Sequence, residues 1–196
     1  MQLHKISTVS VVILLIYILI FSGCGGGNNR KEMTKDTLLS SINKLVDVLN
    51  SDTLIAIHLN NKETRELLDS LNGLCLRYWA YFPGDSQTAD ILYSLAKIQT
   101  KFLKYDEAVS LLTKVTDRYR GWGKRDEALL MIAFIYDNIL KNKVEAKKYY
   151  QLVIEEYPES RSAQIAAQAL KIIDVPEEEL VKQITASGSE QEHAKK

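Results

Sequence analysis

The chain contains little that breaks a helix. It has three prolines and nine glycines in 196 residues, and four of the glycines (Gly23, Gly25, Gly26 and Gly27) surround a single cysteine. Proline and glycine are the least favourable residues inside a helix, so the remainder of the chain can form long helices. We therefore expect an all-α fold.

Net charge is also missing. Lys and Arg together number 25, as do Asp and Glu, and residues 1–23 hold one of these charges, on Lys5. The chain therefore has no overall positive field that would attract a nucleic acid or another polyanion. We expect no nucleic-acid partner.

Residues typical of catalytic and metal sites are scarce. Beyond residue 23 the histidines are His58 and His193, and neither has a partner at metal-ligand spacing. Cys75 lies in an apolar helical stretch, which indicates a small core residue rather than a reactive thiol. Carboxylate runs such as residues 177–179 are typical of helix starts and solvated faces. Because no nucleophile motif occurs either, we expect no catalytic residue, no metal, no cofactor and no enzymatic activity.

The N-terminus carries a long apolar run. Residues 9–21 are apolar except for Ser10 and the hydroxyl group of Tyr17, and small residues follow at positions 22 and 23. A run of about 7–15 apolar residues followed by small residues is typical of a secretory signal. A membrane-spanning helix usually needs about 20 residues.

The junction Phe21-Ser22-Gly23-Cys24 resembles a lipobox, where a lipoprotein signal peptidase cleaves before a diacylated cysteine. It departs from the usual motif at Phe21, where leucine is common. The resemblance implies a signal peptide at residues 1–23 and a lipid on Cys24 that attaches the protein to a membrane; an uncleaved single-span anchor is the alternative. Position 25 holds glycine, whereas an aspartate after the cysteine would resemble an inner-membrane retention signal. We expect a lipid-anchored protein of the cell envelope, at the outer membrane and facing the periplasm, with the inner membrane left open.

Apolar residues recur at helical spacing from Asp36 onward. Stripes at residues 38–49 and 67–78 predict the first two helices, and Asn60-Asn61 offers an N-cap to the second. The end of the second helix resembles two later segments, each a helix end near a tyrosine. The three are spaced by about 37 residues, which indicates a repeated helix pair. These segments are Tyr81-Phe82-Pro83, Tyr119-Arg120-Gly121 and Tyr157-Pro158.

Small residues occupy matching positions inside the repeats. Ala96 is followed twelve residues later by Ala108, and Ala133 thirteen residues later by Ala146. Small side chains let two helices approach closely. With the proline after the second pair, the pattern resembles the tetratricopeptide repeat. The resemblance implies an all-α fold of tetratricopeptide-type helix-turn-helix repeats that form a short α-solenoid. The pattern departs at Gln99, where tyrosine is usual.

Composition and the repeat pattern together divide the chain. Residues 24–35 are expected to form a flexible tether, residues 36–185 the tetratricopeptide-like repeat domain, and residues 186–196 a disordered tail. The apolar spacing of residues 162–173 predicts a helix that closes the stack. A short helix is expected to follow, from the Pro176 region to Thr185. Four tyrosines are expected to pack at core positions of the repeats: Tyr119, Tyr136, Tyr150 and Tyr157.

The stretch from Tyr81 to Lys182, especially residues 134–142 and 175–182, is similar to a group of tetratricopeptide lipoproteins of Gram-negative bacteria. It is more distantly similar to the tetratricopeptide lipoprotein of the outer-membrane β-barrel assembly machinery. The resemblance implies a scaffold that binds another envelope protein or a peptide segment, with outer-membrane protein assembly as one setting. The alternative is a structural envelope protein that self-associates or contacts peptidoglycan, since these repeats are generic scaffolds. The oligomeric state stays open.

In this repeat class the concave surface is formed by the first helix of each pair, on the side away from the second helix. Aromatic anchors among mixed charges suit an extended peptide. The alternative for Tyr93 and Phe134 is burial against a neighbouring helix, and Trp122 is either a second contact or packed under its own helices. The candidate groove residues are Asp90, Tyr93, Lys97, Lys101, Glu127, Leu130, Phe134, Asp137 and Asn138.

Overall fold

The computed structural model describes residues 34–51, 62–176 and 178–179. The chain divides into two units, Met1–Leu38 and Leu39–Lys196. In the first unit the described residues are 34–38, at the start of a helix. The expected signal peptide, the lipidated cysteine, the Asn60-Asn61 N-cap, most of the helix up to Thr185 and the tail from residue 186 all lie outside the described residues.

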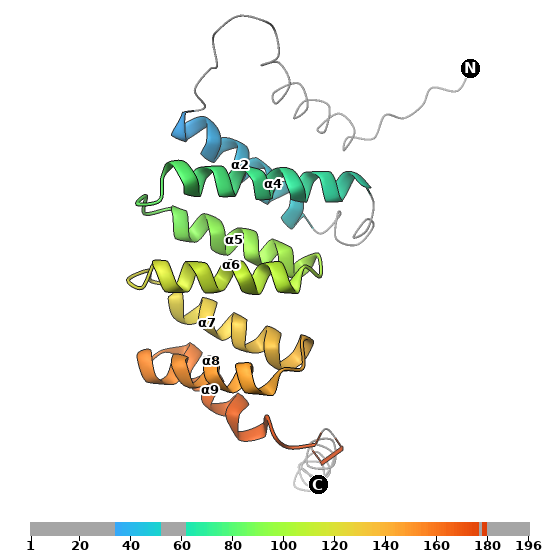
Figure 1. Cartoon of the computed structure of the whole chain (residues 1–196), viewed down its shortest axis with the longest axis vertical. Helices are drawn as coiled ribbons and strands as arrows, with labels where there is room; N and C mark the ends of the chain where they lie inside the picture. The colour runs from blue at the N-terminus through green and yellow to red at the C-terminus, as the bar shows by residue number, and fades with distance from the viewer. Residues whose placement is uncertain (1–33, 52–61, 177, 180–196) are drawn as a thin grey trace, which may run out of the picture. The chain divides into compact units, whose positions relative to one another are not determined.

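The described residues are helical, with no β-strand among them. The helices agree with the expected stripes and turns, and one of them continues into a short π-helical segment, η1 (Figure 1). Their bounds are α2 Lys35–Asn50, α4 Lys62–Tyr81, α5 Thr88–Lys101, α6 Tyr105–Arg118, α7 Arg125–Phe134, η1 Ile135–Ile139, α8 Lys143–Glu156 and α9 Arg161–Ile172.

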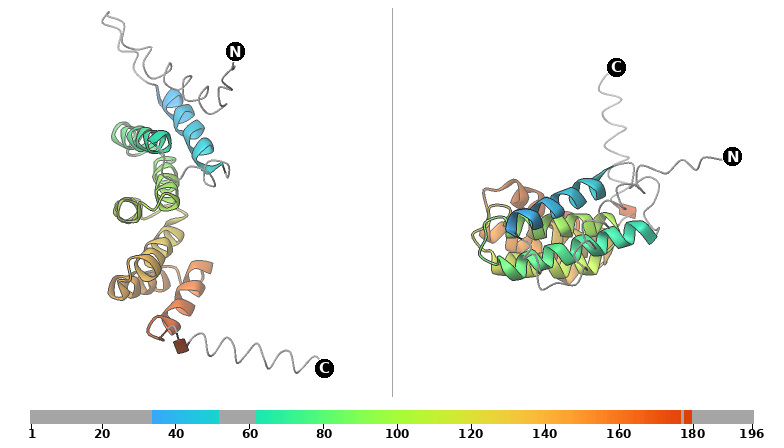
Figure 2. Two further views of the ribbon diagram at one scale, coloured as in Figure 1. Left: turned by 90° about the vertical axis from the view of Figure 1, so that its right-hand side faces the viewer. Right: turned by 90° about the horizontal axis from the view of Figure 1, so that it is seen from above.

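Helices that follow one another in sequence pack together. Within residues 39–196, α5 contacts α6 and α7 contacts α8 as antiparallel pairs. The first pair contacts the second through α6 and α7, while α4 packs on α5 and α9 packs on α8. Figure 2 shows these helices stacked in sequence order. Helices α4, α6 and α8 end at Tyr81, Arg118 and Glu156, which agrees with the expected period of about 37 residues. The all-α fold of packed helix pairs is therefore confirmed.

The small residues lie where the helices of a pair meet. Ala96, Ala108, Ala133 and Ala146 are all fully buried. Ala133 and Ala146 belong to one apolar cluster that α7, α8 and α9 share. Because an alanine side chain occupies little volume at such a contact, the two helix axes can lie close together.

Cys75 and Tyr150 are both fully enclosed in the core. Burial raises the pKa of the Cys75 thiol to about 12, so this cysteine is an inert packing residue. The expectation for Cys75 is confirmed. Tyr119, Tyr136 and Tyr157 are only partly buried, and the hydroxyl of Tyr119 donates a hydrogen bond of 3.0 Å to the carbonyl oxygen of Pro83.

The π segment η1 accommodates the longer spacing of the second helix pair. Ala96 is five residues from the end of α5, whereas Ala133 is six residues from the end of η1. The turns that follow are equally long, since α6 begins at Tyr105 and α8 at Lys143. A π turn holds one more residue than an α turn, so the extra residue between Ala133 and Ala146, compared with Ala96 and Ala108, lies within η1.

Deletion of Asn138 is expected to convert η1 into a regular α-helical turn. The shortened helix would have the spacing of α5, with Ile135 at the position of Ile98 and both side chains still in the core. We expect the free energy of unfolding to change by less than about 1 kcal/mol, since the exposed Asn138 side chain contributes one 3.3 Å hydrogen bond to its own helix.

Chemical denaturation followed by circular dichroism measures this change. Deletion of Ser110, which is exposed in the middle of α6, is the matched control. It would rotate every later core residue of α6 by about 100° and is expected to unfold the pair. Equal losses for the two deletions would contradict the role given to η1.

Arg125 joins the ends of three helices. Its side chain is only 3 % exposed, and its Nε donates a 2.7 Å hydrogen bond to the carbonyl oxygen of Thr116 near the end of α6. Its Nη1 donates to the hydroxyl of Tyr157 at 3.0 Å and to the carboxylate of Glu156 at the end of α8. Burial alone would lower the pKa of Arg125, but the hydrogen bonds to Glu156 and Tyr157 hold it above its ordinary value. The guanidinium therefore links two successive helix pairs.

Candidate functional site

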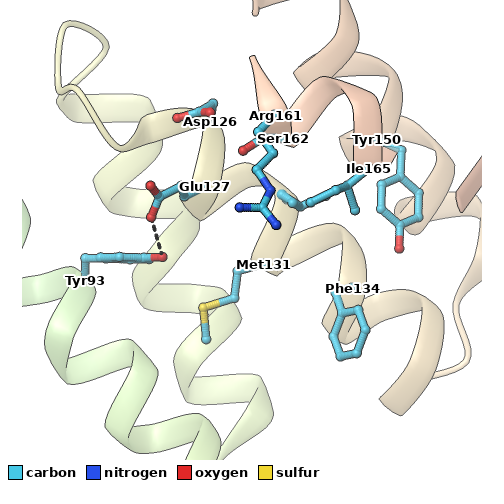
Figure 3. A pocket seen from close by; sticks show the side chains of 10 residues that line it. Tyr93, Asp126, Glu127, Met131, Phe134, Tyr150, Arg161, Ser162 and Ile165 are labelled. Atoms are coloured by element: carbon cyan, nitrogen blue, oxygen red, sulfur yellow. Dashed lines mark hydrogen bonds between the residues drawn. The ribbon is translucent and has the colours of Figure 1, made fainter. Parts of the chain in front are cut away.

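A pocket of about 550 Å³ opens beside α7, between α5 and α9 (Figure 3). Most of its lining comes from the first helix of each pair, as expected for a concave surface. Its lining residues are Tyr93, Asp126, Glu127, Leu130, Met131, Phe134, Tyr150, Arg161, Ser162 and Ile165.

One side of the pocket is apolar and accessible. Phe134, near the end of α7, is 54 % exposed, and Ile165 on α9 is exposed as well. Leu130 and Met131 lie one turn earlier on α7 and are partly buried. The alternative of burying Phe134 against a neighbouring helix is therefore wrong. Exposed aromatic and aliphatic side chains at the edge of a pocket are typical of a contact surface.

The other side of the pocket carries charges of both signs. Asp126 and Glu127 lie in the first turn of α7, and Arg161 begins α9. Figure 3 shows the guanidinium of Arg161 extending into the pocket between Glu127 and Ile165. In the described part of the chain, Arg161 has no hydrogen-bond or ion-pair partner. The pocket can therefore offer an unused cation to an anionic group.

Tyr93 is held in place by three neighbours. Its hydroxyl donates a 3.4 Å hydrogen bond to Glu127 Oε2, and Lys97 Nζ lies 5.5 Å from the centre of its ring. Its ring meets the indole of Trp122 edge-on, with centroids 5.2 Å apart. Burial and the Glu127 carboxylate raise the pKa of Tyr93 to about 12. Tyr93 thus packs against Trp122 and still lines the pocket, and Trp122 is partly buried.

Four of the nine candidate residues line the pocket: Tyr93, Glu127, Leu130 and Phe134. The other five are engaged elsewhere. Asp90 forms a 2.7 Å ion pair with Lys124, Lys101 donates a 2.6 Å hydrogen bond to Asn50, and Asp137 accepts one of 3.3 Å from Tyr150. Asn138 donates to the carbonyl oxygen of Phe134, and Lys97 lies over Tyr93.

The sequence reasoning missed the contribution of α9. Arg161, Ser162 and Ile165 come from a helix that was expected only to close the stack. A signal for their role does exist, because Ser162 follows Pro158 much as Thr88 follows Pro83, and both Ser162 and Thr88 are buried. Helix α9 thus occupies the place of the first helix of a further pair.

The described part of the chain shows neither a metal cluster nor a membrane span. Its His, Cys, Asp and Glu residues form no cluster that could hold a metal ion. None of its helices combines the length and the apolar character that crossing a membrane requires.

Residues 90–121 and 127–160 each match the family model of the tetratricopeptide repeat. The two segments are tetratricopeptide repeats. The first comprises most of α5 and all of α6, and the second comprises most of α7, η1 and α8. No curated protein matches the chain in sequence. Tetratricopeptide repeats are protein-interaction scaffolds, and here the first helices of both repeats line the pocket.

Proposed function

We propose that the tetratricopeptide repeats bind an extended segment of another cell-envelope protein in the pocket beside α7, and that the chain performs no catalysis itself. The observation that carries the proposal is the combination of exposed Phe134 and Ile165 with the unpaired cation of Arg161. These three groups keep much of their surface exposed in the folded domain. A bound segment could use all of them.

The pocket indicates the chemistry of that segment. A large apolar side chain would pack against Phe134 and Ile165, and an acidic side chain would meet Arg161. Asp126 and Glu127, on the same charged side of the pocket as Arg161, favour a basic residue in the same segment. We therefore expect a segment that combines a large apolar residue with a basic and an acidic one.

The setting rests on the N-terminal sequence. The apolar run and the lipobox-like junction at Cys24 support attachment to a membrane outside the cytoplasm, with the periplasmic face of the outer membrane as the favoured place. A scaffold tethered there could hold an envelope protein during outer-membrane protein assembly. Loss of labelling with radioactive palmitate in a Cys24→Ser variant would test the anchor separately from the pocket.

A photo-crosslinking residue at Phe134 is expected to capture one discrete envelope protein in cells. The matched control places the same residue at Leu76, which is also exposed but lies on α4, away from the pocket. Products are identified by mass spectrometry. In the same background, Arg161→Glu is expected to reduce the product at least about tenfold, since it turns an attraction into a repulsion. Arg120→Glu, in an exposed turn, should leave it unchanged.

Equal products from residues 134 and 76 would overturn the pocket as the binding surface. Capture of further copies of the chain alone would favour the structural alternative, in which the protein self-associates. A discrete product that Arg161→Glu does not reduce would keep the pocket but remove the acidic residue from the description of the partner.

A further inference from the structure

A second surface lies at the turns inside the two repeats. The connection from α5 to α6 and that from η1 to α8 emerge on the same side of the stack, whereas the connections from α4 to α5 and from α6 to α7 emerge on the opposite side (Figure 1). Exposed aliphatic side chains lie in or directly beside both turns: Leu103 is 65 % exposed in the first turn, and Ile139 (40 %) and Val144 (77 %) flank the second. We call this surface the turn edge; its residues are Leu103, Lys104, Ile139, Lys141, Lys143 and Val144.

Stability does not explain the residues of the turn edge. Leu103 and Lys141 occupy equivalent positions, two residues after the end of α5 and of η1, and both have a positive φ, 60° and 54°. Glycine or asparagine would adopt this left-handed conformation at lower cost. Leucine at such a position also leaves a large apolar side chain in water. A strained residue that exposes apolar surface points to a use outside the fold.

The composition of the turn edge favours a lipid surface over a protein partner. Protein interfaces are enriched in tyrosine, tryptophan and arginine and depleted in lysine. The turn edge is aliphatic and rich in lysine; of the two aromatic residues that flank its first turn, Phe102 is buried and Tyr105 is partly buried. Aliphatic side chains flanked by lysines are typical of surfaces that lie on anionic bilayers, where the lysine stems follow the apolar groups and the ammonium groups meet phosphates.

The carboxylates around the turn edge offset only part of this positive charge, although the exposed Asp106 and Glu107 both lie in the first turn of α6. Glu107 lies 3.5 Å from Lys104, but both side chains are more than half exposed, and such a pair contributes little. Glu145 pairs with Lys148 at 3.0 Å, and Asp174 pairs with Lys147 at 2.6 Å. Among the residues that the structure describes, Lys141 and Lys143 form no ion pair within 4.0 Å, although Lys143, after Lys147, helps to lower the pKa of Asp174.

We propose that the turn edge docks on an anionic phospholipid bilayer, with Leu103, Ile139 and Val144 at the level of the headgroups and Lys104, Lys141 and Lys143 against their phosphates. The surface is distinct from the peptide-binding pocket beside α7, and the proposal depends neither on lipidation nor on a partner protein. Docking through the turns would hold the helix pairs at a fixed orientation to the membrane.

An environment-sensitive fluorophore on a single cysteine tests the proposal. The full chain with Cys24→Ser carries Val144→Cys or, as the matched control, Arg120→Cys in an exposed turn on the opposite side. Cys75 is fully buried and has a pKa of about 12, so it does not compete for the label. Labelled chains are mixed with vesicles of phosphatidylcholine alone or with phosphatidylglycerol added, and flotation of the same samples reports the bound fraction.

We expect the label at residue 144 to shift its emission to shorter wavelength on the anionic vesicles and the label at residue 120 to stay unchanged. Lys141→Gln combined with Lys143→Gln should weaken docking at least about tenfold, at roughly fivefold for each lysine. The exposed pair Lys114→Gln and Arg118→Gln on α6 should have a much smaller effect. Raising the salt from about 0.1 M to about 0.5 M should also weaken docking.

Three results would overturn the proposal. The first is a chain that does not float with anionic vesicles. The second is a chain that floats while the labels at residues 144 and 120 respond alike. The third is an emission shift at residue 144 that is as large on phosphatidylcholine vesicles as on anionic ones and does not change when Lys141 and Lys143 are replaced. Each of these leaves the peptide-binding pocket untouched.

Discussion

Replacement of Arg125 by alanine is expected to lower the free energy of unfolding by about 3 kcal/mol. The substitution removes a buried guanidinium that donates to Thr116, Glu156 and Tyr157 and leaves the carbonyl oxygen of Thr116 without this partner. It also removes the contact between the guanidinium and the ring of Tyr157, which are 5.8 Å apart. Glu156 remains partly hydrated, which keeps the loss at the lower end of the range for broken buried pairs.

Urea denaturation followed by circular dichroism measures this loss. Arg120→Ala, exposed in the connection that leads to α7, should change the free energy of unfolding by less than about 0.5 kcal/mol. Arg125→Lys should fall between the two, because one ammonium group cannot reproduce the planar set of donors. If Arg125→Ala were as stable as Arg120→Ala, the guanidinium would not link the two helix pairs energetically.

Replacement of Ala133 by leucine is expected to cost about 2–3 kcal/mol. Ala133 is fully buried and shares a close-packed cluster with Ala146 and Tyr150 on α8. Three added carbon atoms have no space there, so α7 must move away from α8 or the leucine must adopt a strained rotamer. Since Leu130 and Phe134 flank this position on α7, the same shift should reduce crosslinking from residue 134.

The control for this substitution is Ala80→Leu, at an exposed position near the end of α4. Both changes add the same side chain to a helix, and the exposed one should stay within about 0.5 kcal/mol of the parent chain. Thermal or denaturant unfolding measures both variants. A loss at Ala133 no larger than that at Ala80 would show that the small residue is not required for the contact between α7 and α8.

The sequence was sufficient to predict the helices, because each one has a clear apolar stripe and polar turn residues. Asn142 and Ser160 illustrate the local chemistry: their side chains accept hydrogen bonds from the backbone N–H of Glu145 and Ala163, at 3.2 and 3.0 Å, and begin α8 and α9. The spacing of Ala133 and Ala146 also revealed the extra residue. It could not show that the residue lies in a π turn, since a longer connection would have fitted the same count.

The pocket was predicted only in part. Periodicity identified which positions of α5 and α7 face away from their partner helices, and Tyr93, Glu127, Leu130 and Phe134 follow from that. Periodicity cannot show which polar side chains find a neighbour inside the fold. Asp90 and Lys101 were expected in the groove, but Lys124 and Asn50 bind them, and these contacts join residues 34 and 51 positions apart in the chain. Arg161 was missed because its helix lies outside the two repeats.

The π segment η1 shows that the length of a repeat can change inside a helix. An insertion in a turn would move the next helix, whereas the extra residue in η1 leaves the turn to α8 as long as its counterpart in the first repeat. Single-residue insertions and deletions could therefore accumulate at this point during evolution without repacking the core. A gain or loss of one residue there would change the surface next to the pocket and leave the stacking of the helix pairs as it is.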